Sequence, residues 1–368
     1  MLVQRLRKTA LALCLLAPLA SQAGPYSNLY VFGDSLSDGG SDHNLSAAIS
    51  AITGGAFPTV PAPNVSPLGR FSNGLVAVDY LANTLGLSLT AHYVTPPFLG
   101  GATAGNNYAQ GGATSGLANA SLPGTIALGP NTVSTGFKGM AGEIADYTST
   151  HAGADPNAVY VVWAGANDFI HPGSAGAAAG CANANAIAAA VCTAVSNITA
   201  GVAALAALGA QHIVVPNLPD LGATAQSIAG GPVAIAQSHA VTVAFNAALV
   251  LSLGGLSSAY PGDIVPFDLY GVFNQILANP AGYGFTNTTL SCLSGSVADA
   301  TSAVTAACAV AGADHYIFWD PIHPTTAAQA IIGQRLAAAL GVPEPSEIAL
   351  LALGMTGLVV VRRRKSAI

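Results

Sequence analysis

Short apolar runs alternate along the chain with longer stretches that carry apolar residues at helical spacing. The short runs are bounded by Gly, Pro, Asn or Asp, which is typical of buried strands: Leu29–Phe32, Val159–Trp163, His212–Val215 and Ile264–Phe267. The longer stretches predict helices, the first two ending at glycines: Ser196–Leu208 before Gly209, Gln237–Leu253 before Gly254-Gly255, and a last helix from near Pro324 through Leu340. Because buried strands that alternate with helices form mostly parallel sheets, the pattern predicts an α/β fold.

Two segments do not fit this alternation. Residues 41–70 are rich in Gly and Pro and are expected to form a loop, and residues 280–312 are an insertion rich in Ala, Ser and Thr. Neither an internal repeat nor a linker divides the rest, so we expect one domain over residues 24–341. Functional side chains of such folds gather at the carboxyl ends of the strands, where the candidate chemistry is sought.

Charge is scarce and unevenly placed. Only 7% of the 368 residues are charged, and 52% are hydrophobic. Seven of the ten Lys and Arg residues lie in two terminal clusters, so residues 24–341 hold three cations against fourteen acids, a formal charge of −11. A body of this kind is neither a disordered polyelectrolyte nor a nucleic-acid binder, which needs a basic patch.

The N-terminal cluster belongs to a predicted secretory signal over residues 1–23. Arg5, Arg7 and Lys8 precede an apolar region from Thr9 to Leu19, and Ser21-Gln22-Ala23 supplies small residues before a cleavage site at Gly24. A buried N-terminal helix would not need this order of charges. The sequence therefore predicts export.

The C-terminal cluster follows a short apolar stretch in residues 342–368. Val342-Pro343-Glu344-Pro345 precedes Ile348–Val361, and Arg362-Arg363-Arg364-Lys365 follows, so the positive-inside rule places the basic end in the cytoplasm. This order resembles the PEP-CTERM sorting signal of Gram-negative bacteria that make exopolysaccharide. The resemblance implies transient anchoring in the membrane, processing by an exosortase, and a mature protein in the periplasm, on the cell surface or in the extracellular matrix.

The cysteines agree with export. Removal of Cys14 with the signal leaves four cysteines, an even number, and no CxxC spacing or adjacent histidine that would favour a metal site. Three disulfide pairings are open. The pairing that is local in sequence joins Cys181 to Cys192 and Cys292 to Cys308.

The first strand runs directly into Gly33-Asp34-Ser35-Leu36-Ser37-Asp38-Gly39-Gly40. Ser35 would present its hydroxyl in the crevice at the strand end, with its N–H free at the start of a helix. The alternative is that Ser35 only caps this helix. The segment is not a Gly-x-Ser-x-Gly nucleophile elbow, because Ser37 occupies the place of the second Gly.

Two further segments could stabilise an oxyanion. The strand Val159–Trp163 leads to Asn167, whose amide can donate a hydrogen bond to developing negative charge, although an Asx-turn is the plainer explanation. Upstream, Gly111-Gly112 would let backbone N–H groups approach a ligand closely, although an ordinary strand-to-helix turn explains it equally.

A candidate acid–base pair lies before the last helix, in Trp319-Asp320-Pro321-Ile322-His323-Pro324. A carboxylate three residues before an imidazole can accept a hydrogen bond from Nδ1 and leave Nε2 as the base. A lone histidine is more often structural. His323 differs from the other seven because Asp320 supplies an acidic partner next to it.

In order, these four blocks resemble the GDSL family of SGNH hydrolases, from about Leu29 to Leu340. Gly69-Arg70-Phe71-Ser72-Asn73-Gly74 is similar to a segment of the lipase-like branch that contains plant and autotransporter esterases. The resemblance implies a three-layer α/β/α sandwich with a mainly parallel central sheet, the flavodoxin-like SGNH hydrolase fold. It also implies Ser35 as nucleophile, His323 as general base, Asp320 as the residue that orients His323, and an oxyanion hole formed by Ser35, Gly112 and Asn167.

The reaction implied is hydrolysis of a carboxylic ester through an acyl-enzyme, which requires neither a metal nor an organic cofactor. The expected substrates are small-molecule, lipid or acylated-glycan esters. Two alternatives remain open: acyl transfer or polysaccharide deacetylation at the same site, and a catalytically silent surface or matrix protein. Asp34, Asp38 and Asp168 adjoin the blocks and are assigned turn and hydrogen-bonding roles.

Overall fold

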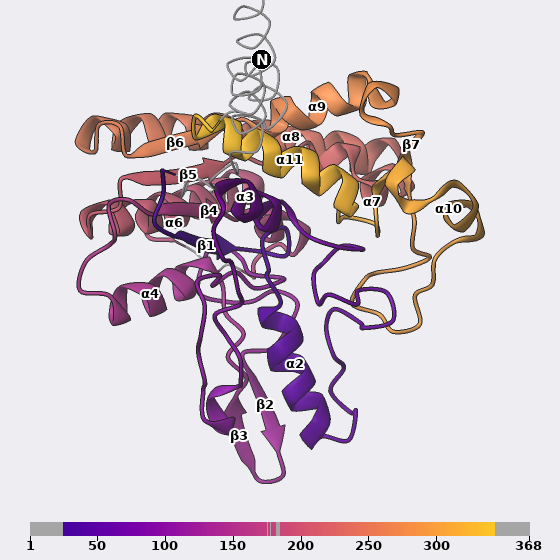
Figure 1. The fold of residues 1–368 in the computed structure, drawn as a ribbon, viewed down its shortest axis with the longest axis horizontal. Helices are drawn as coiled ribbons and strands as arrows, with labels where there is room; N and C mark the ends of the chain where they lie inside the picture. The colour runs from indigo at the N-terminus through magenta and orange to yellow at the C-terminus, as the bar shows by residue number, and fades with distance from the viewer. Residues whose placement is uncertain (1–24, 175, 177, 182–184, 343–368) are drawn as a thin grey trace, which may run out of the picture.

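A computed structural model describes residues 25–174, 176, 178–181 and 185–342 (Figure 1). The predicted signal and almost all of the predicted sorting tail lie outside the described residues. At the centre is a parallel sheet of four strands in the order β1-β4-β5-β6, formed by Leu29–Gly33, Val159–Trp163, His212–Pro216 and Ile264–Phe267. The four predicted strands and the α/β class are therefore confirmed.

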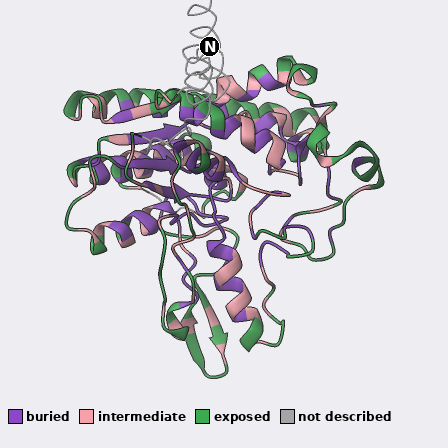
Figure 2. Ribbon diagram, in the orientation of Figure 1, coloured by how far each residue is buried: buried purple, intermediate pink, exposed green. Residues whose placement is uncertain are grey.

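Helices cover both faces of the sheet, which gives three layers. Residues of Met140–Thr150 (α4), Ala186–Ala207 (α6) and Gly231–Ala259 (α8) join one core cluster with Phe32, Val162 and Val215. Residues of Ala77–Leu85 (α3), Leu269–Ala278 (α9) and Thr326–Ala339 (α11) join a second cluster with Val31, Val161 and Val214. Alternate residues of a strand point to opposite faces of the sheet. Because helices cover both faces, all five residues of β4 are buried (Figure 2).

Smaller elements surround this body. The described residues include the helices Ser41–Ile52 (α2), Ala166–Ile170 (α5), Ala225–Ala229 (α7) and Ala306–Ala311 (α10). They also include the strands Thr125–Leu128 (β2), Asn131–Ser134 (β3), Asn287–Ser291 (β7) and Tyr316–Phe318 (β8), and the single 3-10 turns Pro97–Leu99 (η1), Leu221–Ala223 (η2), Pro280–Tyr283 (η3) and Ala313–His315 (η4). The antiparallel pair β2–β3 and helix α2 project away from the sheet (Figure 1).

The loop predicted over residues 41–70 is wrong in its first part, since Ser41–Ile52 is helix α2. All of the Gly and Pro residues of the segment lie after residue 52, and its first twelve residues contain neither. Leu45 and Ile49 are buried in the core, so helical spacing outweighed the composition of the whole segment.

Two predicted helices extend beyond their expected ends. The helix expected from Ser196 begins at Ala186, where the Asn185 side chain accepts hydrogen bonds from the N–H groups of the first turn. The helix expected to end at Gly254-Gly255 continues to Ala259. Glycine costs about 1 kcal/mol within a helix, and burial of Leu253 with packing of Leu256 on the core outweighs that cost.

The last helix begins two residues after Pro324. Thr325 is its N-cap, with the side chain accepting a hydrogen bond from the N–H of Ala328, and the helix runs over Thr326–Ala339. The cysteines form the pairs that are local in sequence, Cys181–Cys192 and Cys292–Cys308.

Candidate active site

Three segments place their carboxyl ends side by side at one edge of the sheet. Ser35 follows β1 and Asn167 follows its neighbour β4. Residues 106–110 run along the free side of β1, where Tyr108 N donates to Val31 O at 2.8 Å and Gln110 N donates to Gly33 O at 3.0 Å. Gly112 therefore comes at the end of a third segment beside β1, and the fold brings the three predicted loops to one place.

Glycine is required at the start of the turn that carries Ser35. Gly33 has a φ of +149°, and a Cβ at this position would lie 2.0 Å from Trp163 O. The absence of a side chain lets β1 and β4 stay paired up to the turn. Asp34 then accepts a hydrogen bond from Leu36 N at 3.0 Å, which holds the turn closed around Ser35.

The Ser35 hydroxyl lies next to the imidazole of His323, with 2.8 Å between Oγ and Nε2. The other ring nitrogen, Nδ1, is 2.9 Å from both carboxylate oxygens of Asp320. All three residues are buried, Ser35 with 8% of its surface exposed and His323 with 6%. The structure thus brings together a hydroxyl, an imidazole and a carboxylate. Asp320 and His323 are three positions apart in the chain, whereas Ser35 precedes Asp320 by 285 positions.

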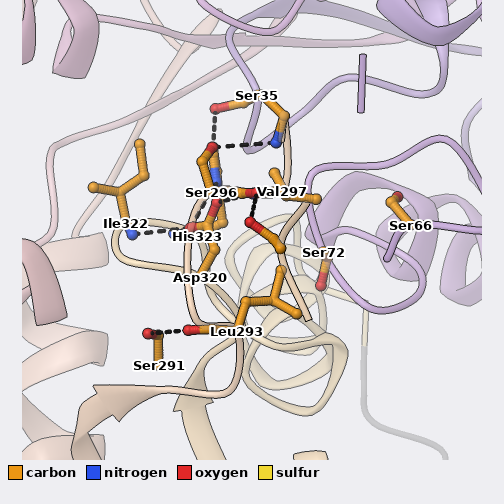
Figure 3. A network of polar contacts seen from close by, with 12 residues as sticks. Ser35, Ser66, Ser72, Ser291, Leu293, Ser296, Val297, Asp320, Ile322 and His323 are labelled. Carbon is orange, nitrogen blue, oxygen red and sulfur yellow. Dashed lines mark hydrogen bonds and ion pairs between the residues drawn. The ribbon is translucent and has the colours of Figure 1, made fainter. Parts of the chain in front are cut away.

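Asp320 is held by three backbone N–H groups (Figure 3). Ile322 N and His323 N donate to Oδ1 at 2.9 and 2.8 Å, and Val297 N donates to Oδ2 at 2.9 Å. Burial alone would raise the pKa of Asp320, but the nearby His323 and these N–H donors hold it below its ordinary value. Asp320 therefore stays ionised, which fixes the ring of His323 with Nε2 toward Ser35.

The segment Gly69–Gly74 supports the turn that carries His323. The Phe71 ring lies 5.3 Å from the imidazole, Ser72 Oγ donates to Pro324 O at 2.9 Å, and Asn73 Oδ1 accepts from Thr326 N at 2.8 Å. Arg70 makes a two-point contact with Asp79, with both N···O distances 3.1 Å. Each residue of the segment from Arg70 to Asn73 thus has a positioning contact.

Asn167 and Ser35 line the same small cavity, of about 50 Å³, together with His323. Asn167 Nδ2 donates one hydrogen bond to Ala113 O at 3.0 Å, and the second N–H of a primary amide is available to a ligand. Gly112, one residue before Ala113, has a φ of +75°, and a Cβ there would lie 2.6 Å from Ser121. Among the described residues, the N–H groups of Ser35 and Gly112 have no hydrogen-bond acceptor.

Buried carboxyl groups fasten the loops around the site. Asp38 accepts from the N–H of Gly111 at 3.0 Å as well as from its own turn, and Asp168 accepts from Ser115 N at 2.9 Å and from Ser115 Oγ at 2.6 Å. Burial raises the pKa of Asp34 to about 7 and that of Asp38 to about 6. The hydrogen-bonding roles expected for these aspartates are seen in the structure.

Sequence reasoning missed two contributors. Glu143, fully buried on α4, accepts a hydrogen bond from Gly33 N at 2.7 Å, and burial raises its pKa well above the ordinary value. Val297 belongs to the insertion 280–312, yet its N–H contacts the carboxylate of Asp320. The signal for Glu143 is its position as an acidic residue among the apolar residues of the stretch that forms α4. No local sequence feature indicates the contact of Val297.

A larger cavity of about 450 Å³ adjoins the small one. The two share Ile170, Leu221, Thr224 and Ile322, and the larger extends between the beginning of α6 and the first turns of α8. Its remaining lining includes Phe169, Ile187, Ala190 and Val241. In the part of the chain that the structure describes, no group of three His, Cys, Asp or Glu residues is placed to hold a metal ion.

Comparison with known proteins gives a consistent match over nearly the whole described chain. The family model of the GDSL-like Lipase/Acylhydrolase matches residues 29–336. A GDSL esterase/lipase of Arabidopsis thaliana is 26% identical over 335 residues, covering 83% of this chain and 86% of the relative. Esterase EstA of Pseudomonas aeruginosa is 29% identical over 371 residues, covering 90% of this chain, and the chain spans about half (49%) of the length of EstA.

Proposed function

The chain belongs to the GDSL-like Lipase/Acylhydrolase family, and on that premise we propose that it is an exported serine esterase with a Ser35-His323-Asp320 triad. The family supports a hydrolase that acts on esters. One observation supports the residue roles: the 2.8 Å contact of Ser35 Oγ with His323 Nε2, in a ring whose Nδ1 lies 2.9 Å from Asp320. This is the arrangement that activates a serine hydroxyl as a nucleophile.

In the proposed first step, Ser35 Oγ attacks the ester carbonyl and His323 Nε2 takes its proton. Asp320 remains an anion, accepts the Nδ1–H of His323 and stabilises the imidazolium. The tetrahedral oxyanion accepts hydrogen bonds from the N–H groups of Ser35 and Gly112 and from the Asn167 amide. Protonation of the leaving alcohol by His323 breaks the C–O bond and leaves an acyl group on Ser35.

In the second step, His323 removes a proton from water as the water attacks the acyl-enzyme. The same donors hold the second oxyanion, and collapse releases the carboxylic acid and restores the Ser35 hydroxyl. The adjoining cavity of about 450 Å³ is the proposed site for the acyl group, because Phe169, Ile170, Ile187 and Val241 give it apolar walls. The preferred substrates are therefore esters with an extended apolar acyl chain.

The experiment that tests this proposal is hydrolysis of p-nitrophenyl esters by the purified protein and its Ser35→Ala variant. We expect the variant to lose at least 10³-fold in kcat, the effect typical of removing a triad nucleophile. Ser37→Ala is the matched control, because Ser37 is a buried serine two positions away in the same turn. Equal rates for the parent and Ser35→Ala would contradict the triad, and the absence of hydrolysis by the parent would favour the silent-protein alternative.

We further propose export by the signal in residues 1–23 and anchoring by the tail of residues 342–368 until an exosortase processes it. Two disulfides, Cys181–Cys192 and Cys292–Cys308, fit an exported protein, because such bonds persist in oxidising compartments. The order of Pro-Glu-Pro, apolar stretch and Arg cluster supports the sorting role of the tail.

A further inference from the structure

Helix α8 is predominantly apolar, yet much of it faces outward. Its 29 residues include no Asp, Glu, Lys or Arg. By length and composition it could cross a membrane, as could α6, but only 22% of the most apolar window of α8 is buried in the structure. Helices without a polar face are normally buried on all sides, so the exposed side of α8 calls for a covering partner.

The exposed side is a continuous apolar row, which we name the α8 stripe. Its larger members are Val233, Val243, Val250 and Leu251, with 69%, 45%, 56% and 77% of their surfaces exposed. At helical spacing between them lie the exposed small residues Ala236, Ala240, Ala244, Ala247 and Gly254. The opposite side packs Phe245, Leu249 and Leu253 into the core, so α8 lies along the surface and cannot span a membrane while the sheet stays intact.

The α8 stripe is continuous with the mouth of the larger cavity. The first turns of α8 contribute Val233, Ala236 and Ala240 to the stripe and, on their neighbouring side, Gln237, Ser238 and Val241 to the cavity wall. On the other side of the mouth, Ile187 of α6 lines the cavity with 49% of its surface exposed. An apolar surface thus borders the mouth of a cavity with several apolar walls, and that cavity adjoins the small one lined by Ser35.

This continuity decides between two possible partners. A second copy of the chain seated on the stripe would close the mouth of the cavity. A lipid layer in the same place would instead bring acyl chains to it. His239, beside the stripe, pairs with Asp220 at 2.8 Å, and the body as a whole is acidic, so the surface offers nothing to attract an anionic layer.

We propose that the α8 stripe docks on a neutral lipid layer, with α8 parallel to its plane and the cavity mouth facing it. The contact is apolar and the body is acidic, so zwitterionic phospholipid is favoured over anionic lipid, and binding to the zwitterionic layer changes little with salt. The choice of a lipid layer over a second copy of the chain rests on the proposed function, because it takes the cavity as the site for the acyl group; the exposure of the apolar stripe does not.

The test uses the full chain with Cys14→Ser and Ser35→Ala, so that lipid is not hydrolysed and binding is independent of catalysis. A single cysteine introduced as Ala247→Cys carries an environment-sensitive NBD label in the middle of the stripe. The matched control places the same label at Val310→Cys, which is 90% exposed on α10, away from α8. The probe is a vesicle of phosphatidylcholine, compared with one containing phosphatidylglycerol.

We expect a blue shift and intensity gain of the label at position 247, and none at position 310, with phosphatidylcholine vesicles. Adding Val250→Glu and Leu251→Glu should weaken this response at least tenfold in lipid concentration, with circular dichroism unchanged. Anchoring through the terminal segments alone would bring the protein to vesicles without a response at position 247, and that result would overturn the proposal. A 247 signal that follows protein concentration without vesicles would indicate a dimer and would also overturn it.

Failure of the two proposals can be told apart. If Ser35→Ala has no effect on soluble esters but the 247 label responds to vesicles, the catalytic roles are wrong and the docking surface stands. If soluble esters are hydrolysed through Ser35 and the label does not respond, the docking proposal is wrong and the catalytic roles stand.

Discussion

Replacement of Ala190 by Phe should make the enzyme selective for short acyl chains. Ala190 lies on α6 and lines the larger cavity, opposite the first turns of α8. The cavity volume is about 450 Å³. If a methylene takes about the volume of a water molecule in the liquid, ~30 Å³, a chain of about ten carbons occupies roughly 300 Å³ and fits. Phenylalanine has six more carbon atoms than alanine, so the ring removes the room of about six methylenes.

The size of the effect follows from burial of the acyl chain. Each buried methylene contributes about 0.8 kcal/mol, close to fourfold in kcat/KM when the chain is bound in the transition state. For the parent enzyme, kcat/KM should therefore rise steeply from acetate to decanoate. In Ala190→Phe, six lost methylenes correspond to about 5 kcal/mol as an upper bound, and we expect at least a 100-fold loss with decanoate and no loss with acetate.

The assay is kcat/KM for p-nitrophenyl acetate, hexanoate and decanoate below their aggregation limits. Ala204→Phe serves as the control, because Ala204 is an exposed residue of the same helix that does not line the cavity. If Ala190→Phe lowers acetate and decanoate equally, the substitution disturbs the triad and the cavity is not the acyl site. A flat dependence on chain length in the parent enzyme would refute the reasoning at its first step.

Three further predictions concern the oxyanion hole, the buried carboxyl groups and the tail. Asn167→Ala should lower kcat by roughly 10²–10³-fold with little change in KM, measured on a soluble ester, because we propose that the amide donates a hydrogen bond to the developing oxyanion. The pKa of buried Asp34 is raised to about 7, so its contribution to stability is full below about pH 4 and lost as pH rises to about 7. Between these pH values the free energy of unfolding of the parent, measured in urea, should fall by an amount on the order of 4 kcal/mol, and that of Asp34→Asn should not fall by this amount. Identical pH profiles for the two proteins would contradict the prediction. Removal of the chain after Pro343 should raise the share of enzyme in the medium of a culture, whereas an unchanged distribution would count against the sorting tail.

The strands and the pairing of Asp320 with His323 could be predicted from the sequence because each depends on a local pattern, whereas the placement of Ser35 beside His323 was implied only by the resemblance of four ordered blocks to a known family. A five-residue apolar run such as Val159–Trp163 is recognisable without its neighbours, and Asp320 lies three residues from His323. Helix ends were less predictable. The continuation of α8 through Gly254 and Gly255 depends on burial of Leu253 against the sheet, a tertiary contact that overrides the low helix propensity of glycine.

Long-range backbone contacts at the site could not be predicted, because almost every residue carries the same N–H group and the sequence does not mark which one will reach a given carboxylate. Val297 N–H reaches Asp320 from an insertion that composition alone marks as featureless, and Glu143 reaches Gly33 across 110 residues. Each contact gives a buried carboxyl group a backbone donor. In a body with only three cations, N–H groups are the partners that the fold can supply in number.

That scarcity of cations explains why several buried carboxyl groups have raised pKa values. Asp34, Asp38, Asp42 and Glu143 are all fully buried or nearly so, and burial raises the pKa of each. Asp320 is equally buried, yet its pKa is lowered, because it alone of the five pairs with the ring of a histidine. The negative charge of the site is therefore concentrated on the carboxylate behind His323.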